Sequence, residues 1–133
     1  MAAELSHGVK KLLSGSNFAH LATLMPDGSP QTTPVWVDVD GNRILVNTAE
    51  GRTKPRNVRR DARVALSVVD QQNPYANASI RGRVVEITHE GADEHIDRLA
   101  KKYLGVDKYP YRSANEQRVI LVIEPDWVVA APA

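Results

Sequence analysis

The chain has 133 residues, which suits one domain with a substantial core, and a net charge of +1, which argues against a general affinity for nucleic acid or membrane surfaces. It contains no cysteine, so disulfides, thiolate metal sites and a cysteine nucleophile are ruled out. No stretch approaches the ~20 apolar residues of a membrane span and the N-terminus lacks the apolar run of a signal peptide, so we expect a cytoplasmic protein.

The first half of the chain is expected to form one short helix and three strands. Apolar residues recur at helical spacing from Leu5 to Leu13, and Gly15 follows as a stop signal. Alternating apolar residues, separated by turn sequences, predict three strands over Phe18–Leu24, Pro30–Asp40 and Arg43–Thr48.

The second half is expected to form two helices and three strands. Thr53 is a good N-cap residue and Pro55 is tolerated in a first helical turn, so a short helix is predicted over Thr53–Arg60. A longer helix is predicted over Gly91–Leu104, because its apolar residues lie on one face. The three strands are predicted over Ala62–Asp70, Ala78–Ile87 with a bulge at Gly82, and Arg118–Pro125.

These elements together predict a mainly β fold. Six strands, early hairpin turns and three short helices favour a six-stranded antiparallel barrel with flanking helices. Closing the sheet would remove the exposed edges that a small β domain must otherwise protect. We expect residues 1–133 to form a single domain of this kind.

The sequence lacks an evident catalytic motif of its own. It contains no P-loop, no G-x-G-x-x-G and no G-x-S-x-G sequence. The four histidines do not pair at metal-ligand spacing. His20 is expected at a hydrogen-bonded core or rim position, and His89 and His95 are expected to face solvent. If the protein is an enzyme, a bound cofactor is therefore expected to carry the difficult step.

The most distinctive local feature is a basic segment after the third predicted strand. Six of the 17 lysines and arginines lie between Arg52 and Arg63, with Asp61 as the one acid among them. The first three crowd the expected helix N-terminus, where free N–H groups attract anions, and they predict a phosphate site formed by Arg52, Lys54 and Arg56. The cations expected to keep a helix face in solvent are Arg59, Arg60 and Arg63. Nucleic-acid binding is disfavoured, because aromatic residues are few.

The order and spacing of several segments resemble the flavin and deazaflavin oxidoreductases of the split β-barrel superfamily, called pyridoxamine 5′-phosphate oxidase-like. More narrowly, the chain resembles the small actinobacterial branch that uses the deazaflavin coenzyme F420. The P-V-W sequence at Pro34–Trp36 and the R-x-K-x-x-N turn at Arg52–Asn57 are the most specific parts. The segments that carry the resemblance are "FAHLATLMPDGSPQTTPVWVDVDGNRILVNT", "RTKPRNVRRDARVALSVVD", "IRGRVVEI", "KKYLG" and "RVILVIEPDWV".

The resemblance implies a homodimer with the cofactor in a groove between two split β-barrels, and a small-molecule acceptor as substrate. It implies that the strand Thr33–Trp36 passes beneath the ring system and that Tyr75 and Asn77 reach in from the other subunit. Trp127 is a weaker candidate, which equally suits a core or dimer-interface aromatic. The full set of implied cofactor-binding residues is Thr33, Pro34, Val35, Trp36, Asn47, Thr48, Arg52, Thr53, Lys54, Arg56, Asn57, Tyr75 and Asn77.

One departure from the resemblance concerns the C-terminus. Pyridoxamine phosphate oxidases carry a substrate motif with Arg and His there, and the tail "DWVVAAPA" has neither residue. This argues against oxidation of vitamin B6. The basic turn suits a polyanionic tail such as the glutamates of the deazaflavin better than a single phosphate, which favours an F420-dependent reductase. FMN as the cofactor, or a carrier that binds F420 or flavin without turnover, stays open as an alternative. The acceptor pocket is expected to be built from the loops Gln71–Tyr75 and Lys108–Ser113.

Overall fold

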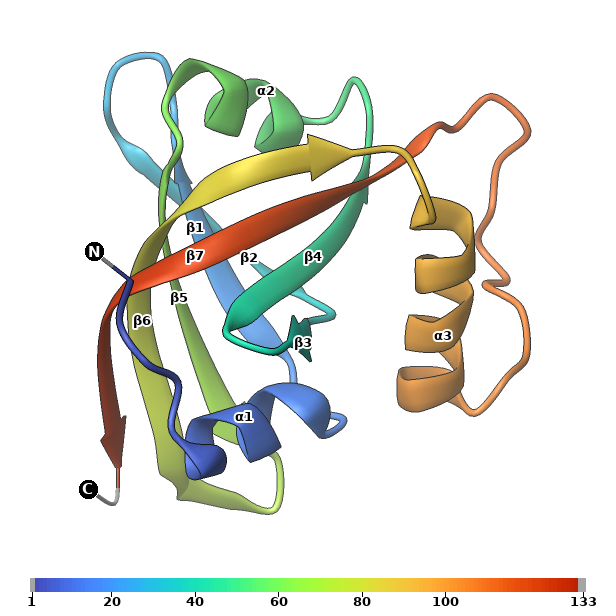
Figure 1. Ribbon diagram of the computed structural model, residues 1–133. Helices are drawn as coiled ribbons and strands as arrows, with labels where there is room; N and C mark the ends of the chain where they lie inside the picture. Colours follow the sequence, from blue (N-terminus) through green and yellow to red (C-terminus); the bar gives the residue numbers. More distant parts are fainter. Residues whose placement is uncertain (1, 132–133) are drawn as a thin grey trace.

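Seven antiparallel strands form one strongly curved sheet in the computed structural model, which describes residues 2–131 (Figure 1). The strands follow the order β2-β1-β5-β6-β7-β4-β3 in the sheet, and three helices flank it. The mainly β, antiparallel split-barrel fold predicted from the sequence is thereby confirmed. The elements are α1 (His7–Ser14), β1 (Ala19–Leu24), β2 (Pro30–Val35), β3 (Asp38–Asp40), β4 (Arg43–Ala49), α2 (Thr53–Arg60), β5 (Arg63–Asp70), β6 (Asn73–Thr88), α3 (Ala92–Leu104) and β7 (Arg118–Ala131).

The number of strands differs from the expected six, because the predicted strand Pro30–Asp40 is two strands. β2 and β3 lie at opposite edges of the sheet although they follow each other in the chain. Between them, the N–H of Val37 donates to Tyr103 Oη (3.1 Å) and the carbonyl of Val37 accepts from Lys102 Nζ (2.6 Å). Side chains of α3 thus take the backbone groups that a continuous strand would pair. The chain crosses from one sheet edge to the other at this point, which curls the sheet into a barrel.

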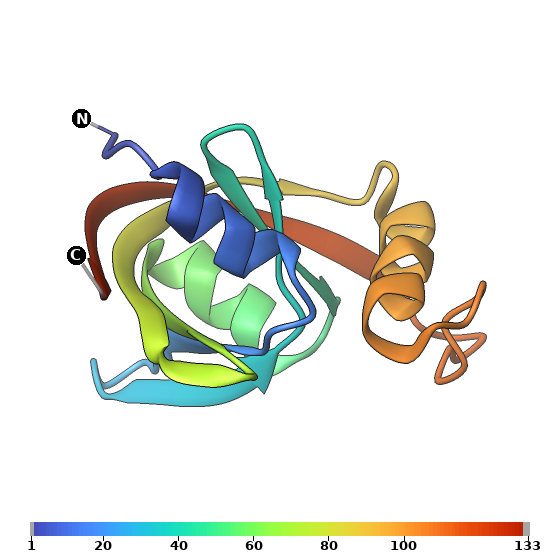
Figure 2. The same cartoon turned by 90° about the horizontal axis from the view of Figure 1, so that it is seen from below.

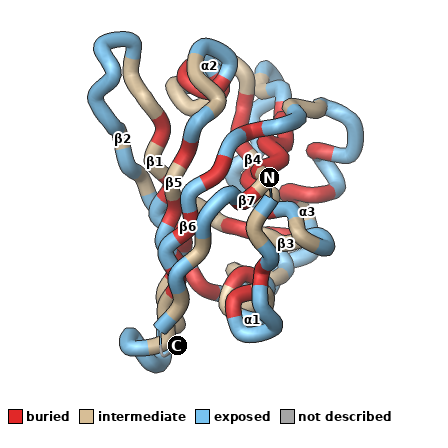
Figure 3. Tube along the Cα trace, turned by 60° about the vertical axis from the view of Figure 1, so that its left-hand side comes forward, coloured by how far each residue is buried: buried red, intermediate tan, exposed pale blue. Residues whose placement is uncertain are grey.

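The core lies inside the barrel and is closed at one end by α1 (Figure 2). Buried and exposed positions alternate along β5 and β6, as expected for strands with one face inward (Figure 3). Helix α1 is capped by Ser6, whose side chain accepts from the N–H of Val9 (3.3 Å). The apolar face of this helix packs onto the barrel interior, whose fully buried side chains include Leu13, Leu21, Ile44, Val46, Val68, Ile80, Leu121 and Ile123.

The antiparallel strands β6 and β7 both extend further than the sequence indicated. The expected loop Gln71–Tyr75 shrinks to a short turn, because β6 begins at Asn73. The C-terminal tail continues β7 through Trp127, which pairs with Arg81. The predicted bulge at Gly82 is confirmed by a shift in register between Arg81 and Gly82. A Cβ atom at Gly82 would lie 2.3 Å from the carbonyl oxygen of Glu124, so only glycine fits there.

Helix α3 stands beside the barrel, and the chain then runs through a long connection, residues 105–117, before β7 returns to the sheet (Figure 1). Within residues 2–131, no helix combines the length and the apolar character needed to cross a membrane. The same residues contain no group of three or more histidine, aspartate or glutamate side chains placed to hold a metal ion.

Candidate functional site

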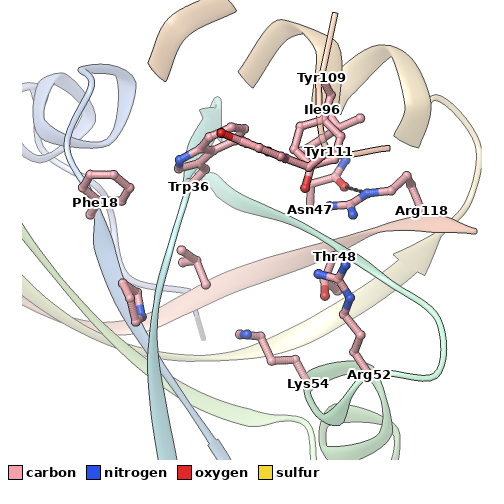
Figure 4. A pocket seen from close by; sticks show the side chains of 12 residues that line it. Phe18, Trp36, Asn47, Thr48, Arg52, Lys54, Ile96, Tyr109, Tyr111 and Arg118 are labelled. Carbon is pink, nitrogen blue, oxygen red and sulfur yellow. Dashed lines mark hydrogen bonds between the residues drawn. The ribbon is translucent and has the colours of Figure 1, made fainter. Parts of the chain in front are cut away.

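A cavity of about 270 Å³ opens where α2, β4, α3 and the connection 105–117 meet the crossing between β2 and β3 (Figure 4). Arg52 and Lys54 lie at one end of this cavity and most of its aromatic side chains at the other, beside Arg118 (Figure 4). Its lining residues are Phe18, Pro34, Val35, Trp36, Asn47, Thr48, Arg52, Lys54, Ile96, Tyr109, Tyr111 and Arg118.

The basic end is formed by the start of α2. Arg52 is the N-cap of this helix, in place of the predicted Thr53, and no side chain caps the helix there. Its N-terminal N–H groups therefore remain available to a ligand. Arg52 Nη2 donates to Glu116 Oε1 (2.7 Å). The pKa of Lys54 is lowered by burial and by the neighbouring charge of Arg52. This cluster favours a negatively charged group, which would stabilise the ammonium form of Lys54.

A buried polar chain runs behind the cavity and connects four elements. Arg118 Nε donates to Asn47 Oδ1 (2.9 Å). Asn47 Nδ2 donates to the carbonyl of Ala92 (2.9 Å) and lies 3.1 Å from His95 Nδ1. His95 Nε2 in turn lies 3.2 Å from Asp38 Oδ2. The arrangement fixes the orientation of the Asn47 amide and holds the Arg118 guanidinium against the cavity.

The position of His95 corrects the expectation that it faces solvent, because its side chain is fully buried. Since Asn47 Nδ2 is a donor, His95 Nδ1 must accept, and the ring proton resides on Nε2 and is donated to Asp38. Burial raises the pKa of Asp38, but hydrogen bonds from His95 and from the N–H of Val39, together with the charge of Lys102, hold it below its ordinary value. A sequence signal existed: His95 lies three residues after Ala92 and so belongs to the apolar stripe of α3.

Five of the chain's seven aromatic residues cluster at the aromatic end, and all of them except Tyr103 line the cavity. Trp36 stacks on Tyr103, with ring centroids 5.2 Å apart and planes within 4°. Phe18 also packs against Tyr103, with ring centroids 5.5 Å apart. Tyr109 meets Trp36 edge-on at 5.9 Å, and Tyr111 meets Tyr109 edge-on at 5.7 Å. Such a cluster offers flat apolar surface and ring edges to a planar ligand.

The structure brings seven of the thirteen residues expected to bind the cofactor to the cavity wall. Edge strand β2 suits the proline of the P-V-W sequence, because an edge strand need not donate every N–H to a neighbour. The seven residues are Pro34, Val35, Trp36, Asn47, Thr48, Arg52 and Lys54.

The other six expected residues do not line the cavity of this chain. Asn57 is buried and donates to Thr23 Oγ1 (2.9 Å), so it ties α2 to β1. Tyr75 is 83% exposed at the start of β6, and the side chain of Asn77 donates to the carbonyl of Pro74. Thr33 Oγ1 is buried without a hydrogen-bond partner. Thr53 is half-buried in the first turn of α2, and Arg56 is exposed on the same helix.

Five cavity residues were not singled out from the sequence. Tyr109 and Tyr111 lie in the loop Lys108–Ser113, which was expected to shape the acceptor pocket only as a whole. Arg118 begins a strand whose next five residues are apolar, and an arginine in such a place was the available signal. Phe18 and Ile96 gave no signal beyond ordinary apolar character.

The second half of the basic segment faces away from the cavity, and its three arginines are exposed, as predicted. Arg59 forms a bidentate ion pair with Glu50, in which Nη1 donates to Oε1 (2.6 Å) and Nη2 donates to Oε2 (2.8 Å). Arg60 donates to the carbonyl of Leu24 (2.9 Å), and Arg63 pairs with Asp61 (2.7 Å). These arginines are therefore engaged in holding the surface around α2.

Comparison with known proteins agrees with this fold. The family described as Pyridoxamine 5′-phosphate oxidase matches residues 5–130. A solved structure named F420 Reductase is 32% identical, with a TM-score of 0.82 over 94% of this chain and 98% of that one. A conserved hypothetical protein from Mycobacterium tuberculosis is 25% identical, with a TM-score of 0.73 over 97% of this chain and 85% of that one. HupZ from Group A Streptococcus, at 19% identity and a TM-score of 0.69 over 97% and 95% of the two chains, shares the fold.

Proposed function

The chain belongs to the pyridoxamine 5′-phosphate oxidase family, and we propose that it is an oxidoreductase that uses the deazaflavin coenzyme F420 to reduce a small organic acceptor. The observation that carries this proposal is the cavity itself, in which a basic end is continuous with a wall of flat side chains. A coenzyme with an anionic tail and a planar ring needs both features in one groove.

The residues present fit such a coenzyme. At the basic end, Arg52 and Lys54 would hold the phosphate, and the uncapped start of α2 would add N–H donors. Arg56 lies on the exposed side of the same helix, where it would meet a longer acidic tail that continues past Lys54. The wall Pro34–Trp36 would lie beneath the ring.

When bound, the coenzyme supplies hydride chemistry that no side chain of the chain can provide. The protein would contribute binding, orientation and the exclusion of water. Asn47 and Thr48 would fix the coenzyme beside the ring, because the amide of Asn47 cannot rotate between Arg118 and His95. The aromatic end would stack the acceptor in a fixed orientation, and orientation of this kind contributes on the order of 7–11 kcal/mol to a reaction barrier.

We further propose a homodimer in which a second copy covers the cavity. Tyr75 and Asn77 lie on the chain's own surface, outside its own cavity. In a dimer, these residues of one copy would complete the coenzyme site of the other. Either variant alone, Lys54→Met or Tyr75→Ala, would weaken both sites of its homodimer. Mixing the two variants should then restore part of the lost activity, because each mixed dimer contains one site with both residues intact.

Titration with F420 and with FMN, followed by fluorescence, tests the proposal. We expect micromolar or tighter binding of F420 and much weaker binding of FMN. Micromolar binding of FMN without binding of F420 would overturn the choice of coenzyme. Tight binding of F420 without reduction of any acceptor, over a panel of enones and quinones, would instead identify a carrier.

A further inference from the structure

Two arginines at the cavity share a single carboxylate oxygen. Arg52 Nη2 donates to Glu116 Oε1 at 2.7 Å, and Arg118 Nη1 lies 3.0 Å from the same oxygen. The second oxygen, Glu116 Oε2, is buried and has no hydrogen-bond partner. Arg118 Nη1 is likewise buried, and its geometry toward Glu116 is too poor for a hydrogen bond. Arginine and carboxylate groups normally pair through two parallel hydrogen bonds, so this contact is far from saturated.

We propose that Arg118 forms a second anion subsite of the cavity and that Glu116 occupies this subsite only while no ligand carboxylate is present. The ligand class is a planar conjugated ring that bears a carboxylate. As a subsite for the acceptor, the inference rests on the proposed function and deepens it, because it names a chemical group that the acceptor carries.

The guanidinium of Arg118 is built into the cavity rather than merely exposed beside it. Its side chain is only 4% exposed, and Asn47 fixes its orientation through Nε. His95 and Asp38 support Asn47 from behind, so the guanidinium cannot turn toward solvent. A buried cation that is held in place and incompletely paired marks a site where a charged ligand group is expected.

The ring portion of the ligand follows from what surrounds Arg118. The guanidinium lies over the ring of Tyr109, 5.2 Å from its centroid. Tyr109 in turn contacts Trp36 and Tyr111 edge-on. A ligand carboxylate at Arg118 would therefore place its attached ring against this aromatic end, where stacking adds affinity for a planar group.

Glu116 can leave its position without opening the whole connection 105–117. Asp97 of α3 holds the middle of that connection through the N–H of Tyr109 (2.9 Å) and through Arg112 (2.6 Å). The carbonyl of Gln117 accepts from the N–H of Glu50 (2.9 Å) and fixes its end. Rotation of the Glu116 side chain between these anchors is enough to free Arg118.

A second glutamate provides a matched control. Glu124 also lies between two arginines, Arg43 (3.3 Å) and Arg83 (3.5 Å), but these residues do not line the cavity. Glu116→Gln and Glu124→Gln make the same chemical change and the same change in net charge. Only the first removes a competitor for Arg118, so a general electrostatic effect would appear equally in both variants.

The test is calorimetric titration of the full chain with 2-naphthoate and with the neutral 2-naphthamide. We expect Glu116→Gln to bind naphthoate at least fivefold more tightly than the unchanged protein, with no such gain for naphthamide or in Glu124→Gln. Arg118→Gln should weaken naphthoate binding at least tenfold. Equal gains in the two glutamate variants, equal gains for the two ligands, or no naphthoate binding would each overturn the subsite.

The same titration with F420 already bound separates this inference from the proposed function. Retained naphthoate binding supports an acceptor subsite beside the coenzyme. Mutual exclusion of naphthoate and F420 would assign Arg118 to the coenzyme and overturn the acceptor subsite. Failure of F420 to bind at all would overturn the proposed function. The naphthoate affinity of Glu116→Gln would still decide whether Arg118 is an anion subsite.

Discussion

The two ends of the cavity are built in different ways. The basic end comes from one continuous stretch, in which Arg52 and Lys54 begin α2. The aromatic end and the polar chain behind it combine residues that are far apart in sequence: Arg118 bonds Asn47 across 71 positions, and Asn47 contacts His95 across 48. A local cluster of like residues can be recognised in a sequence, whereas a cluster assembled by the fold cannot.

The two ends also differ in burial. The side chain of Arg52 is 54% exposed, whereas those of Arg118 and His95 are almost completely buried. Substitution at the basic end should therefore change ligand binding with little effect on stability. Substitution in the buried polar chain should change stability as well, because it leaves desolvated groups without partners.

The largest effect is expected for His95→Leu. Leucine removes both ring nitrogens, which leaves one hydrogen of the Asn47 amide and a half-buried Asp38 carboxylate without their partner. We expect a loss of about 2–4 kcal/mol in the free energy of unfolding, the scale of breaking a buried polar network. Urea unfolding measures this loss. His89→Leu, at a half-exposed histidine, is the control and should cost less than about 1 kcal/mol. Equal losses of stability in the two variants would contradict the expectation that burial sets the cost of removing a histidine.

At the basic end, Lys54→Met should weaken F420 binding by about 1.5–3 kcal/mol, the scale of one hydrogen bond to a charged group. Arg60→Met should do much less, because Arg60 is engaged with Leu24 and Asn57 outside the cavity. Fluorescence titration gives both affinities. Equal small effects would place the coenzyme elsewhere.

Substitution of Arg56 tests how far the bound anion extends over α2. The sequence grouped Arg56 with Arg52 and Lys54, but its side chain is exposed and does not line the cavity. A loss of affinity in Arg56→Met for F420 with a long acidic tail, but not for a form without the tail, would show that the tail continues over α2. No loss for either form would restrict the anion site to Arg52 and Lys54.

The fold was predictable because its signals are local. Alternating apolar residues and turn sequences gave nearly every strand, and glycine at position 82 marked its bulge. The division of Pro30–Asp40 was not predictable, because it depends on Tyr103 and Lys102, which bond Val37 from α3. Sequence spacing between positions 37 and 103 carries no information about such a contact.

The residues of the site also divide into those that local sequence predicts and those that only the fold brings together. Asn47 and Thr48 follow from the family resemblance, and Arg52 and Lys54 also from their charge at the start of a helix. The role of Glu116 and Arg118 could not be predicted, because it depends on the tertiary fold. Only the pairing of β7 with β4 brings these two residues to Arg52. The solvent-facing assignment of His95 failed because its polar character outweighed its place in the apolar stripe.

The affinity for an anionic coenzyme should also depend on pH through Lys54. Burial and the charge of Arg52 lower the pKa of Lys54 below the ordinary value of 10.5. In the free protein, Lys54 therefore loses its proton at a lower pH than an exposed lysine does. The phosphate is fully ionised above neutral pH and adds no change there. F420 affinity should therefore fall as pH rises from neutral toward 10.5. Lys54→Arg should remain flat over this range, because arginine stays charged. An equal fall in both proteins would place the titrating group elsewhere.

The smallest effect is expected outside the cavity, at Glu50. This residue tests whether an exposed ion pair contributes less to the free energy of unfolding than the buried polar chain does. Hydrogen bonds from Arg59 and His89 lower the pKa of Glu50 from 4.5 to about 2. A carboxylate with a lowered pKa contributes stability above its unfolded pKa, and that contribution is lost as pH falls from 4.5 toward 2. Glu50→Gln should thus lower stability at neutral pH and flatten its dependence on acid. Because Arg59 and His89 are about half exposed, solvent screening should keep the loss below about 1 kcal/mol. A loss above about 2 kcal/mol in urea unfolding at neutral pH would show that an exposed ion pair around α2 matters as much as the buried chain through His95.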